Sequence, residues 1–257
     1  MEQNQNPCTR KYLVDYLNAY LEIDRYRDYC PNGLQVEGKA QISRIGVAVT
    51  ACEETIESAI ASEVDALIVH HGLFWDRGSH VAVGSMSRKL KALLDAEINL
   101  LAYHLALDGH CEVGNNWVAA RELRAEECEA CFPLNGMPIG VKGRISPVSY
   151  ENFAETLNRY YSHKVHVAPG GDHLIEKVAF LSGGGHKMLF EAVKEGCDAL
   201  VTGSFDEPLW YQAREEGIHF FALGHSATEE IGPRALGRHL EELFDVECLF
   251  INTYNPF

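Results

Sequence analysis

The sequence has no apolar run of about 18 residues, the length that a membrane-spanning helix needs. Its first ten residues, MEQNQNPCTR, lack the apolar core of a signal peptide. Basic residues are also scarce, since 22 lysines and arginines stand against 37 aspartates and glutamates, for a formal net charge of −15. Such an acidic chain repels phosphate backbones, which excludes a general nucleic-acid binder. We therefore expect a cytoplasmic protein, without a membrane anchor, whose surface attracts cations.

The eight cysteines of this 257-residue chain do not form the spacing pattern of a disulfide framework. Cys128 and Cys131 make a single C-x-x-C, and the second pair that a zinc ribbon needs is missing. The surrounding segment, RELRAEECEAC, predicts a helix. We expect both cysteines to be structural.

Hydrophobic residues make up 46% of the chain and charged residues 23%, which is typical of a globular protein with a sizeable core. Short apolar segments that predict strands alternate with helical patterns of about 10 to 15 residues, and this order indicates βαβ units with a parallel sheet. The predicted strands are residues 44–51, 66–70, 98–104, 177–183, 197–203 and 218–225. The predicted helices between them are residues 53–63, 87–97, 186–196 and 206–217.

Two local similarities indicate that the second half repeats the first. VDALIVHHGLFW resembles CDALVTGSFDEPLW in its first half, and YHLALD resembles GHSATE, since each has a histidine four residues before a carboxylate. We predict an α/β fold of two related α/β domains with a metal site in the cleft between them. Residues 1–126 plus 220–257 form the domain that carries most metal ligands. Residues 127–219, including a less regular stretch at 131–172, form the second.

Histidines end three of the predicted strands, and a carboxylate follows two of these histidines at a spacing of four. In an open α/β sheet, ligands bind beyond the carboxyl ends of the strands. A histidine and a carboxylate at i and i+4 share one side of a helix. The residues in this pattern are His70, His71, His104, Asp108, His225 and Glu229.

These side chains offer imidazole nitrogen and carboxylate oxygen, with no thiolate. The set suits zinc, manganese, iron, nickel or cobalt and does not choose among them. It holds more ligands than one open catalytic ion requires, which favours two divalent ions per chain. His80, His110, His163, His166, His173, His186, His219 and His239 are further candidates by composition alone. His219 starts its strand, at the wrong edge, and His110 lies near the cleft. The glycine-rich SGGGH turn before a helix is a weak anion-binding signal.

Several blocks resemble one family, the GTP cyclohydrolase I type 2 / Nif-three-like proteins. They are NGLQVEG, GVAVTAC, HHGLFW, YHLALDGHCEVGNN, CDALVTG, and the run from AREEGIHFFALGH to TEEIGPRALGRHL. The resemblance covers most of the chain and implies a two-domain α/β fold, a dinuclear metal centre and a homohexamer. It also implies that His70, His71, Asp108, His225 and Glu229 are the metal ligands, with Glu229 as the bridge and His104 close by.

The sequence departs from this family at two positions. Ser204 stands where the family often has glutamate after the threonine–glycine pair, and Tyr211 stands where a histidine is common. All five predicted metal-ligand positions are intact, but both departures replace groups that could transfer protons.

Three functions follow as hypotheses. The first is a metal-dependent hydrolase, such as a GTP cyclohydrolase type 2-like enzyme that activates water for attack on a nucleotide, with His104 as the proton carrier. The second is a metal-containing binding or regulatory protein without turnover. The third is a structural α/β protein without a site.

Overall fold

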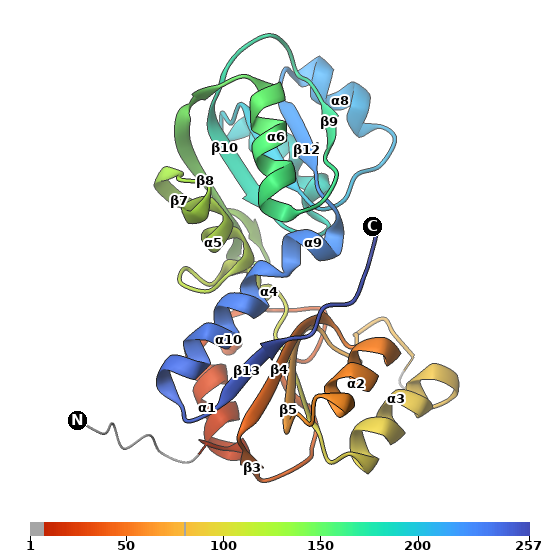
Figure 1. Cartoon of the computed structure of the whole chain (residues 1–257). Helices are drawn as coiled ribbons and strands as arrows, with labels where there is room; N and C mark the ends of the chain where they lie inside the picture. Colours follow the sequence, from red (N-terminus) through yellow and green to blue (C-terminus); the bar gives the residue numbers. More distant parts are fainter. Residues whose placement is uncertain (1–7, 80) are drawn as a thin grey trace, which may run out of the picture. The chain divides into compact units, whose positions relative to one another are not determined.

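The computed structural model describes residues 8–79 and 81–257, so that His80 lies outside the described residues. The chain forms two compact units (Figure 1). The first unit comprises the residues up to Leu107 together with Pro233–Tyr254, and the second comprises Asp108–Gly232 with Asn255–Phe257. Within the described part of the chain, no helix is both long enough and apolar enough to cross a membrane.

The first unit is built on a five-stranded sheet in the order β13-β4-β5-β6-β2. The strands are β2 (Gly33–Val36), β4 (Arg44–Thr50), β5 (Ala66–His71), β6 (Asn99–Ala102) and β13 (Glu247–Phe250). Four of them run parallel and β2 is antiparallel to β6. The short strands β1 (Cys8–Thr9) and β3 (Gln41–Ile42) pair separately. Parallel strands such as β5 are buried on both faces, which explains its nearly uninterrupted apolar sequence.

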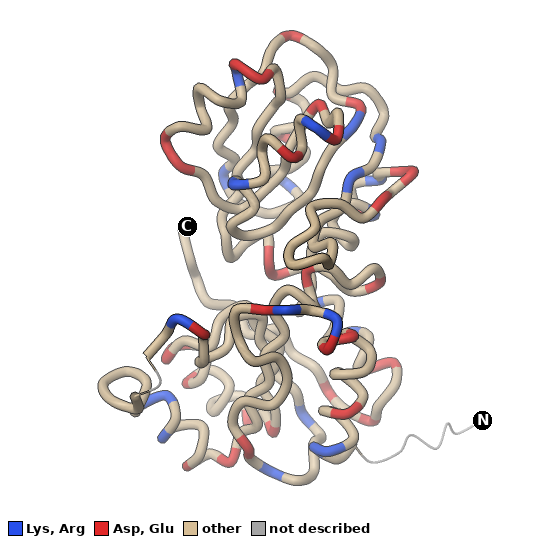
Figure 2. The backbone as a smooth tube through the Cα atoms, turned by 180° about the vertical axis from the view of Figure 1, so that it is seen from behind, with Lys and Arg blue, Asp and Glu red and all other residues tan. Residues whose placement is uncertain are grey.

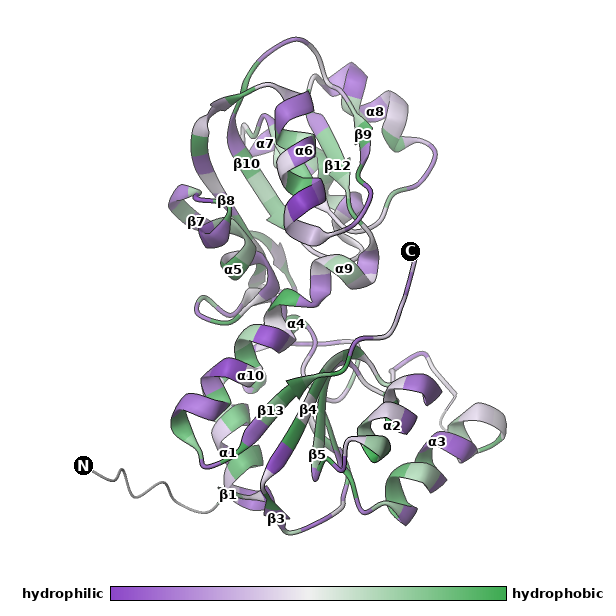
Figure 3. Cartoon of the chain, viewed as in Figure 1, coloured by the Kyte–Doolittle hydropathy of each residue, from purple (hydrophilic) through white to green (hydrophobic). Residues whose placement is uncertain are grey.

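Helices cover both faces of this sheet (Figures 1 and 3). They are α1 (Arg10–Tyr20), α2 (Glu53–Ala61), α3 (Gly84–Asp95) and α10 (Ile231–Leu243). A 3₁₀ turn lies at Ile23–Arg25, and the short helix α4 (Leu105–Gly109) follows β6 and extends into the second unit from Asp108. Ile56 of α2 and Leu93 of α3 pack in one core with Ala48. On the opposite face, α10 approaches so closely that a Cβ at Gly237 would lie 3.3 Å from a methyl of Val47. The apolar strands are therefore shielded on both sides.

The second unit contains a six-stranded sheet in the order β7-β8-β10-β11-β12-β9. The strands are β7 (Glu126–Leu134), β8 (Met137–Val148), β9 (His166–Ala168), β10 (Ile175–Leu181), β11 (Ala199–Thr202) and β12 (His219–Ala222). The helices are α5 (Asn115–Glu122), α6 (Tyr150–Tyr161), α7 (Leu189–Lys194), α8 (Leu209–Glu216) and α9 (His225–Glu229), with a 3₁₀ turn at Gly185–Met188. Strands β10, β11 and β12 are parallel, whereas β8 and β9 join them antiparallel. The core includes Phe153 of α6, Val201 and Phe221.

The segment around Cys128 and Cys131 is a strand, so the predicted helix is wrong there. Helix α5 ends at Glu122, and the chain then pairs as β7 with β8 in a long antiparallel hairpin. Asn135 and Gly136 form its turn, with φ values of 51° and 90°, the left-handed conformation that tight hairpin turns require. The stretch at 131–172, expected to be less regular apart from a short helix at SYENFAETLNRYY, is thus largely regular, and that helix is present as Tyr150–Tyr161. Both cysteines are free thiols, and burial raises the pKa of each.

The two units repeat one arrangement, as the local sequence similarity predicts. In each, three successive parallel strands are joined by helices, and the third leads into a short helix, α4 or α9. Asp65 and Asp198 occupy equivalent places before the second strand. Each carboxylate accepts hydrogen bonds from two backbone N–H groups at the start of the preceding strand. The α/β fold of two related units is therefore confirmed.

The predicted limits between the domains are 126/127 and 219/220. The two compact units divide instead after Leu107 and after Gly232. Helix α5 belongs to the second unit, because it packs on β8 and β10. Its Asn116 donates to the carbonyl of Ile139 and accepts a hydrogen bond from the Ser182 backbone N–H. Of the five predicted metal ligands, Asp108, His225 and Glu229 consequently lie in the second unit, and only His70 and His71 lie in the first.

Candidate metal centre

Three histidines meet at one edge of the first unit's sheet. His70 and His71 end β5, and His104 follows the neighbouring parallel strand β6, so both strands deliver them to the same edge. The imidazole centroids lie 4.7 Å apart for His70 and His71, 5.0 Å for His70 and His104, and 5.6 Å for His71 and His104. One ligand atom from each residue falls within 4.8 Å of the others, close enough to share an ion.

Gly72 follows the two histidines for a steric reason. A Cβ at this position would lie 2.3 Å from Oε1 of Gln35, an oxygen that accepts a hydrogen bond from the Leu73 backbone N–H. Glycine therefore allows Gln35 to approach the chain directly after the histidine pair. The NGLQVEG and HHGLFW segments are linked at this contact.

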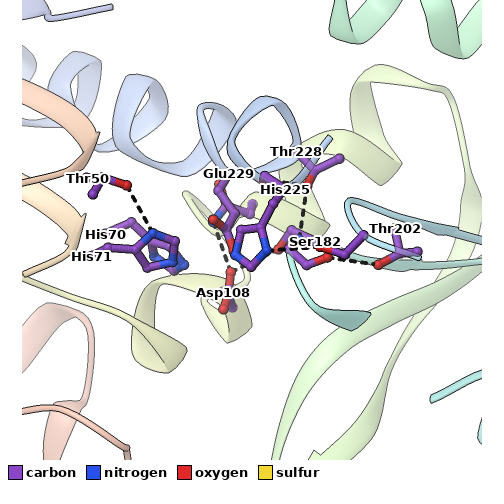
Figure 4. Close-up of polar contacts among 12 residues, drawn as sticks. Thr50, His70, His71, Asp108, Ser182, Thr202, His225, Thr228 and Glu229 are labelled. Atoms are coloured by element: carbon purple, nitrogen blue, oxygen red, sulfur yellow. Dashed lines mark hydrogen bonds and ion pairs between the residues drawn. The ribbon is translucent and has the colours of Figure 1, made fainter. Parts of the chain in front are cut away.

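Each histidine of this group is held through its Nδ1 atom. Nδ1 of His70 lies 3.1 Å from the carbonyl oxygen of Tyr103, and because a carbonyl only accepts, Nδ1 carries the proton. Nδ1 of His71 lies 3.1 Å from Oγ1 of Thr50 (Figure 4). Fixing Nδ1 in this way orients the ring and presents the basic Nε2 nitrogen, which is typical of metal-binding histidines.

Asp28 holds His104, and it did not stand out in the sequence. Its Oδ1 atom lies 2.7 Å from Nδ1 of His104, and its Oδ2 atom accepts hydrogen bonds from the Leu105 backbone N–H and from Asn32. The Asp28 side chain is only 3% exposed. Burial by itself raises the pKa of Asp28, but the hydrogen bond and charge of His104 outweigh it and lower the pKa. The carboxylate thus stays ionised beside the imidazole.

Cys30 lies next to this dyad. One ligand atom each from Asp28, Cys30 and His104 falls within 4.8 Å of the others. Burial is the largest cause that raises the pKa of the Cys30 thiol, to about 12. The thiol is therefore neutral at neutral pH and is a poor metal ligand in that form.

In the second unit, His225 and Glu229 lie one turn apart on α9, as the spacing predicts. Nε2 of His225 is 3.2 Å from Oε1 of Glu229, whose side chain is 4% exposed. The helix begins after Gly224, at a φ of 91° that favours glycine. Nδ1 of His225 lies 3.0 Å from Oγ of Ser204. Ser204, one of the two departures from the family pattern, therefore has a clear structural role, because its hydroxyl orients the ring of a predicted metal ligand.

The SGGGH turn lies directly beside His225 and Glu229. A Cβ on Gly183, whose φ is 57°, would lie 2.0 Å from Oε1 of Glu229 and 3.0 Å from Nε2 of His225. Thr228 accepts a hydrogen bond from the Gly183 backbone N–H, and the Gly183 carbonyl accepts from Gly203 and Ser204. Glycine is required here because the backbone passes directly beside the Glu229 carboxylate.

Asp108 is the other carboxylate of the predicted set, and it is 6% exposed on α4. Its Oδ1 atom accepts hydrogen bonds from Nδ2 of Asn115 at 2.9 Å and from Oγ of Ser182 at 3.0 Å. Figure 4 shows Asp108 and Ser182 side by side. Asn115 in turn accepts from the Gly232 backbone N–H. The GNN block and the SGGGH turn therefore both serve to hold Asp108, a role that neither motif revealed by itself.

The donor chemistry of both groups fits divalent metal ions. Imidazole nitrogens with anchored Nδ1 atoms and buried carboxylates are the ligands that zinc, manganese and iron accept. Acidic residues are spread over both units, with basic residues interspersed (Figure 2). His219 is structural, since it is buried and bonded to the Gly170 N–H and the His173 carbonyl. Nδ1 of His110 accepts from the Glu112 and Val113 backbone N–H groups within its own loop.

Comparison with known proteins adds to this geometry. Residues 8–256 match the model of the family described as Duf34/NIF3 (NGG1p interacting factor 3). A Chlamydia muridarum protein named GTP cyclohydrolase 1 type 2 homolog is 42% identical over 247 residues, covering 95% of this chain and 98% of its own. The solved structure titled protein ybgI, unknown function, has a TM-score of 0.92 at 36% identity, covering 97% of this chain and 100% of its own. The protein TTHA1606 from Thermus thermophilus has a TM-score of 0.89 at 37% identity, with the same coverage.

Proposed function

Because this chain belongs to the Duf34/NIF3 family, we propose that it is a metal-dependent hydrolase of the GTP cyclohydrolase 1 type 2-like kind. Two divalent ions per chain would be held by His70, His71, Asp108, His225 and Glu229. Both groups of ligands would serve one dinuclear centre, as the family resemblance implies. The observation that carries the proposal is the fixed Nδ1 atom of each histidine, because packing alone does not require such uniform orientation.

The chemistry divides between the ions and the chain. Divalent ions of this kind, when bound, lower the pKa of water and supply hydroxide near neutral pH. The chain's own contribution is a proton carrier at Nε2 of His104. Since Asp28 accepts the proton on Nδ1, Nε2 can take a proton from a nucleophile and return it to a leaving group. The substrate would be a small molecule, and the names of the relatives favour a nucleotide such as GTP.

A second candidate is a metal-containing binding or regulatory protein without turnover. Ser204 and Tyr211 favour it, since they replace groups that could transfer protons in the family pattern. Tyr211 is 57% exposed on α8, and Ser204 is engaged with His225. Both hypotheses predict the same metal content and differ only in chemistry.

The test measures metal content and turnover together. The protein would be loaded with zinc, manganese or iron in separate samples, and each sample assayed on GTP and a panel of other nucleotides. His71→Ala and Glu229→Gln should lose metal and activity, whereas His173→Ala, an exposed histidine, should keep both. Full metal content without turnover of any nucleotide would reject the hydrolase and favour the binding protein. Less than one ion per chain, unchanged by His71→Ala, would reject both. Sedimentation would test the homohexamer that the resemblance implies.

A further inference from the structure

A cavity of about 490 Å³ lies in the second unit, on the edge strand of its sheet. We call it the β9 cavity, and it is bounded by β9, by Phe220 of β12 and by the segment from Phe205 to Trp210. Strand β9 ends the sheet in the described part of the chain. The volume of the β9 cavity falls in the range of about 300–1,000 Å³ that small-molecule sites occupy.

Aromatic rings form much of the wall of the β9 cavity. Phe205 is 53% exposed and Trp210 is 45% exposed, although rings of this size are usually buried. Phe205 lies against His166, with ring centroids 4.7 Å apart and planes tilted by 34°. Phe220 is buried and closes the inner side. Two large aromatic side chains are therefore left accessible at the β9 cavity instead of being packed into the core.

Apart from His166, the charged side chains that line the β9 cavity are both acidic. Asp206 and Glu207 are exposed carboxylates on its rim, and none of the described residues that line it is a lysine or an arginine. Trp210 already attracts one cation, since the guanidinium of Arg214 lies 5.3 Å from its ring centroid. Arg214 does not line the cavity. The π-faces and the carboxylates both favour a positive ligand and disfavour an anion.

From this combination we infer that the β9 cavity binds a small organic cation, of the alkylammonium or alkylguanidinium class. The cation would sit against Trp210 and Phe205, with Asp206 and Glu207 balancing its charge. An inorganic metal ion fits less well, because the wall is mostly aromatic and aliphatic carbon, its two carboxylates are exposed, and its one imidazole, His166, lies against the Phe205 ring. This site is separate from the metal ligands of the proposed function, so the two can fail independently.

Titration with tetramethylammonium and with N-methylguanidinium would test the inference, with binding followed by NMR at the Trp210 indole. The neutral tert-butanol, of similar size, serves as the ligand control. We expect saturable binding of the cations and at least a fewfold weaker binding of the alcohol. Trp210→Leu should weaken cation binding by about 10-fold, consistent with a cation–π contact. Glu207→Gln should weaken it severalfold, whereas Glu216→Gln, which changes an exposed carboxylate at the far end of α8, should not.

Equal binding of tert-butanol, or equal loss in Glu207→Gln and Glu216→Gln, would overturn the inference. A second result would also overturn it: the parent protein binds no cation, and Trp210→Leu sediments differently from the parent. The surface around Trp210 would then be covered by a second copy of the chain. Glu207→Gln leaves every aromatic ring in place and so keeps the test valid if Trp210→Leu misfolds. Metal content measured in the same samples should stay unchanged.

Discussion

Oγ of Ser204 lies 3.0 Å from Nδ1 of His225, and this contact joins the segment that follows β11 to the first residue of α9. A hydroxyl can donate to or accept from an imidazole nitrogen, so Ser204 fixes the ring without adding a charge. The family pattern often has a glutamate at this position. In this chain the residue at position 204 therefore orients a proposed metal ligand.

Ser204→Ala should weaken metal binding by about 10-fold, the lower end of what the loss of a hydrogen-bond partner to a ligand costs. The physical reason is that His225, whose side chain is 41% exposed, gains rotational freedom once Nδ1 is released. Competition with a chromophoric chelator measures the affinity. Ser204→Thr keeps the hydroxyl and serves as the control, and equal affinities in Ser204→Ala and the parent would remove this role.

Asp28→Asn should destabilise the protein by about 1–3 kcal/mol, because a buried charge-assisted hydrogen-bond network is broken. It should also shift His104 away from a single Nδ1-protonated tautomer, since an amide no longer attracts that proton as a carboxylate does. Urea unfolding and the nitrogen chemical shifts of His104 provide the two measurements. Asp24→Asn, an exposed carboxylate nearby, should change neither. An unaltered His104 tautomer in Asp28→Asn would contradict the assignment.

Gly183→Ala should be destabilising by about 2 kcal/mol or more, since the new Cβ meets the Glu229 carboxylate and φ is 57°. It should reduce metal affinity as well, because Glu229 and His225 must move away. Gly184 offers a matched control. Its φ is −78°, and a Cβ there would come no closer than 4.0 Å to His225. If Gly183→Ala and Gly184→Ala unfold at the same urea concentration, the steric argument fails.

Asp65 should make the stability of the first unit depend on acid pH. Burial alone would raise its pKa, but hydrogen bonds from Lys39, Ser43 and Arg44 outweigh burial and lower the pKa from 3.8 to about 2. The ionised form therefore stabilises the folded state above about pH 4, and this contribution is lost as the pH falls toward 2. After allowance for solvent screening, the loss should be about 1–2 kcal/mol.

Unfolding free energies measured between pH 5 and pH 2 test this dependence. Asp65→Asn should flatten the slope over that window and lower stability at pH 5. Asp95→Asn removes an exposed carboxylate from α3 and should leave the slope as it is. A slope in Asp65→Asn equal to that of the parent would show that other carboxylates carry the acid dependence.

Local sequence patterns were sufficient for several parts of the fold and of the candidate centre. The strand β5, which ends in His70 and His71, and the four-residue spacing of His225 and Glu229 follow from short-range signals that tertiary contacts do not alter. The other two predicted strands are shorter than expected, since β6 ends at Ala102 before His104, and β12 ends at Ala222 before His225, the first residue of α9. The β7–β8 hairpin was missed although Asn135–Gly136 is a strong turn signal. The preceding EECEAC segment has helical composition, and only pairing with β8 makes it a strand.

The sequence by itself determined the α/β class, the repeat and the identity of the candidate ligands, because periodicity and strand ends are properties of adjacent residues. The tertiary structure decided which groups hold those ligands. Asp28 lies 76 residues from His104, and Ser204 lies 21 residues from His225. It also decided that α5 joins the second unit, through Asn116 and its contacts with β8 and β10. Hydrogen bonds between distant segments have no periodic signature, so no window of sequence contains them.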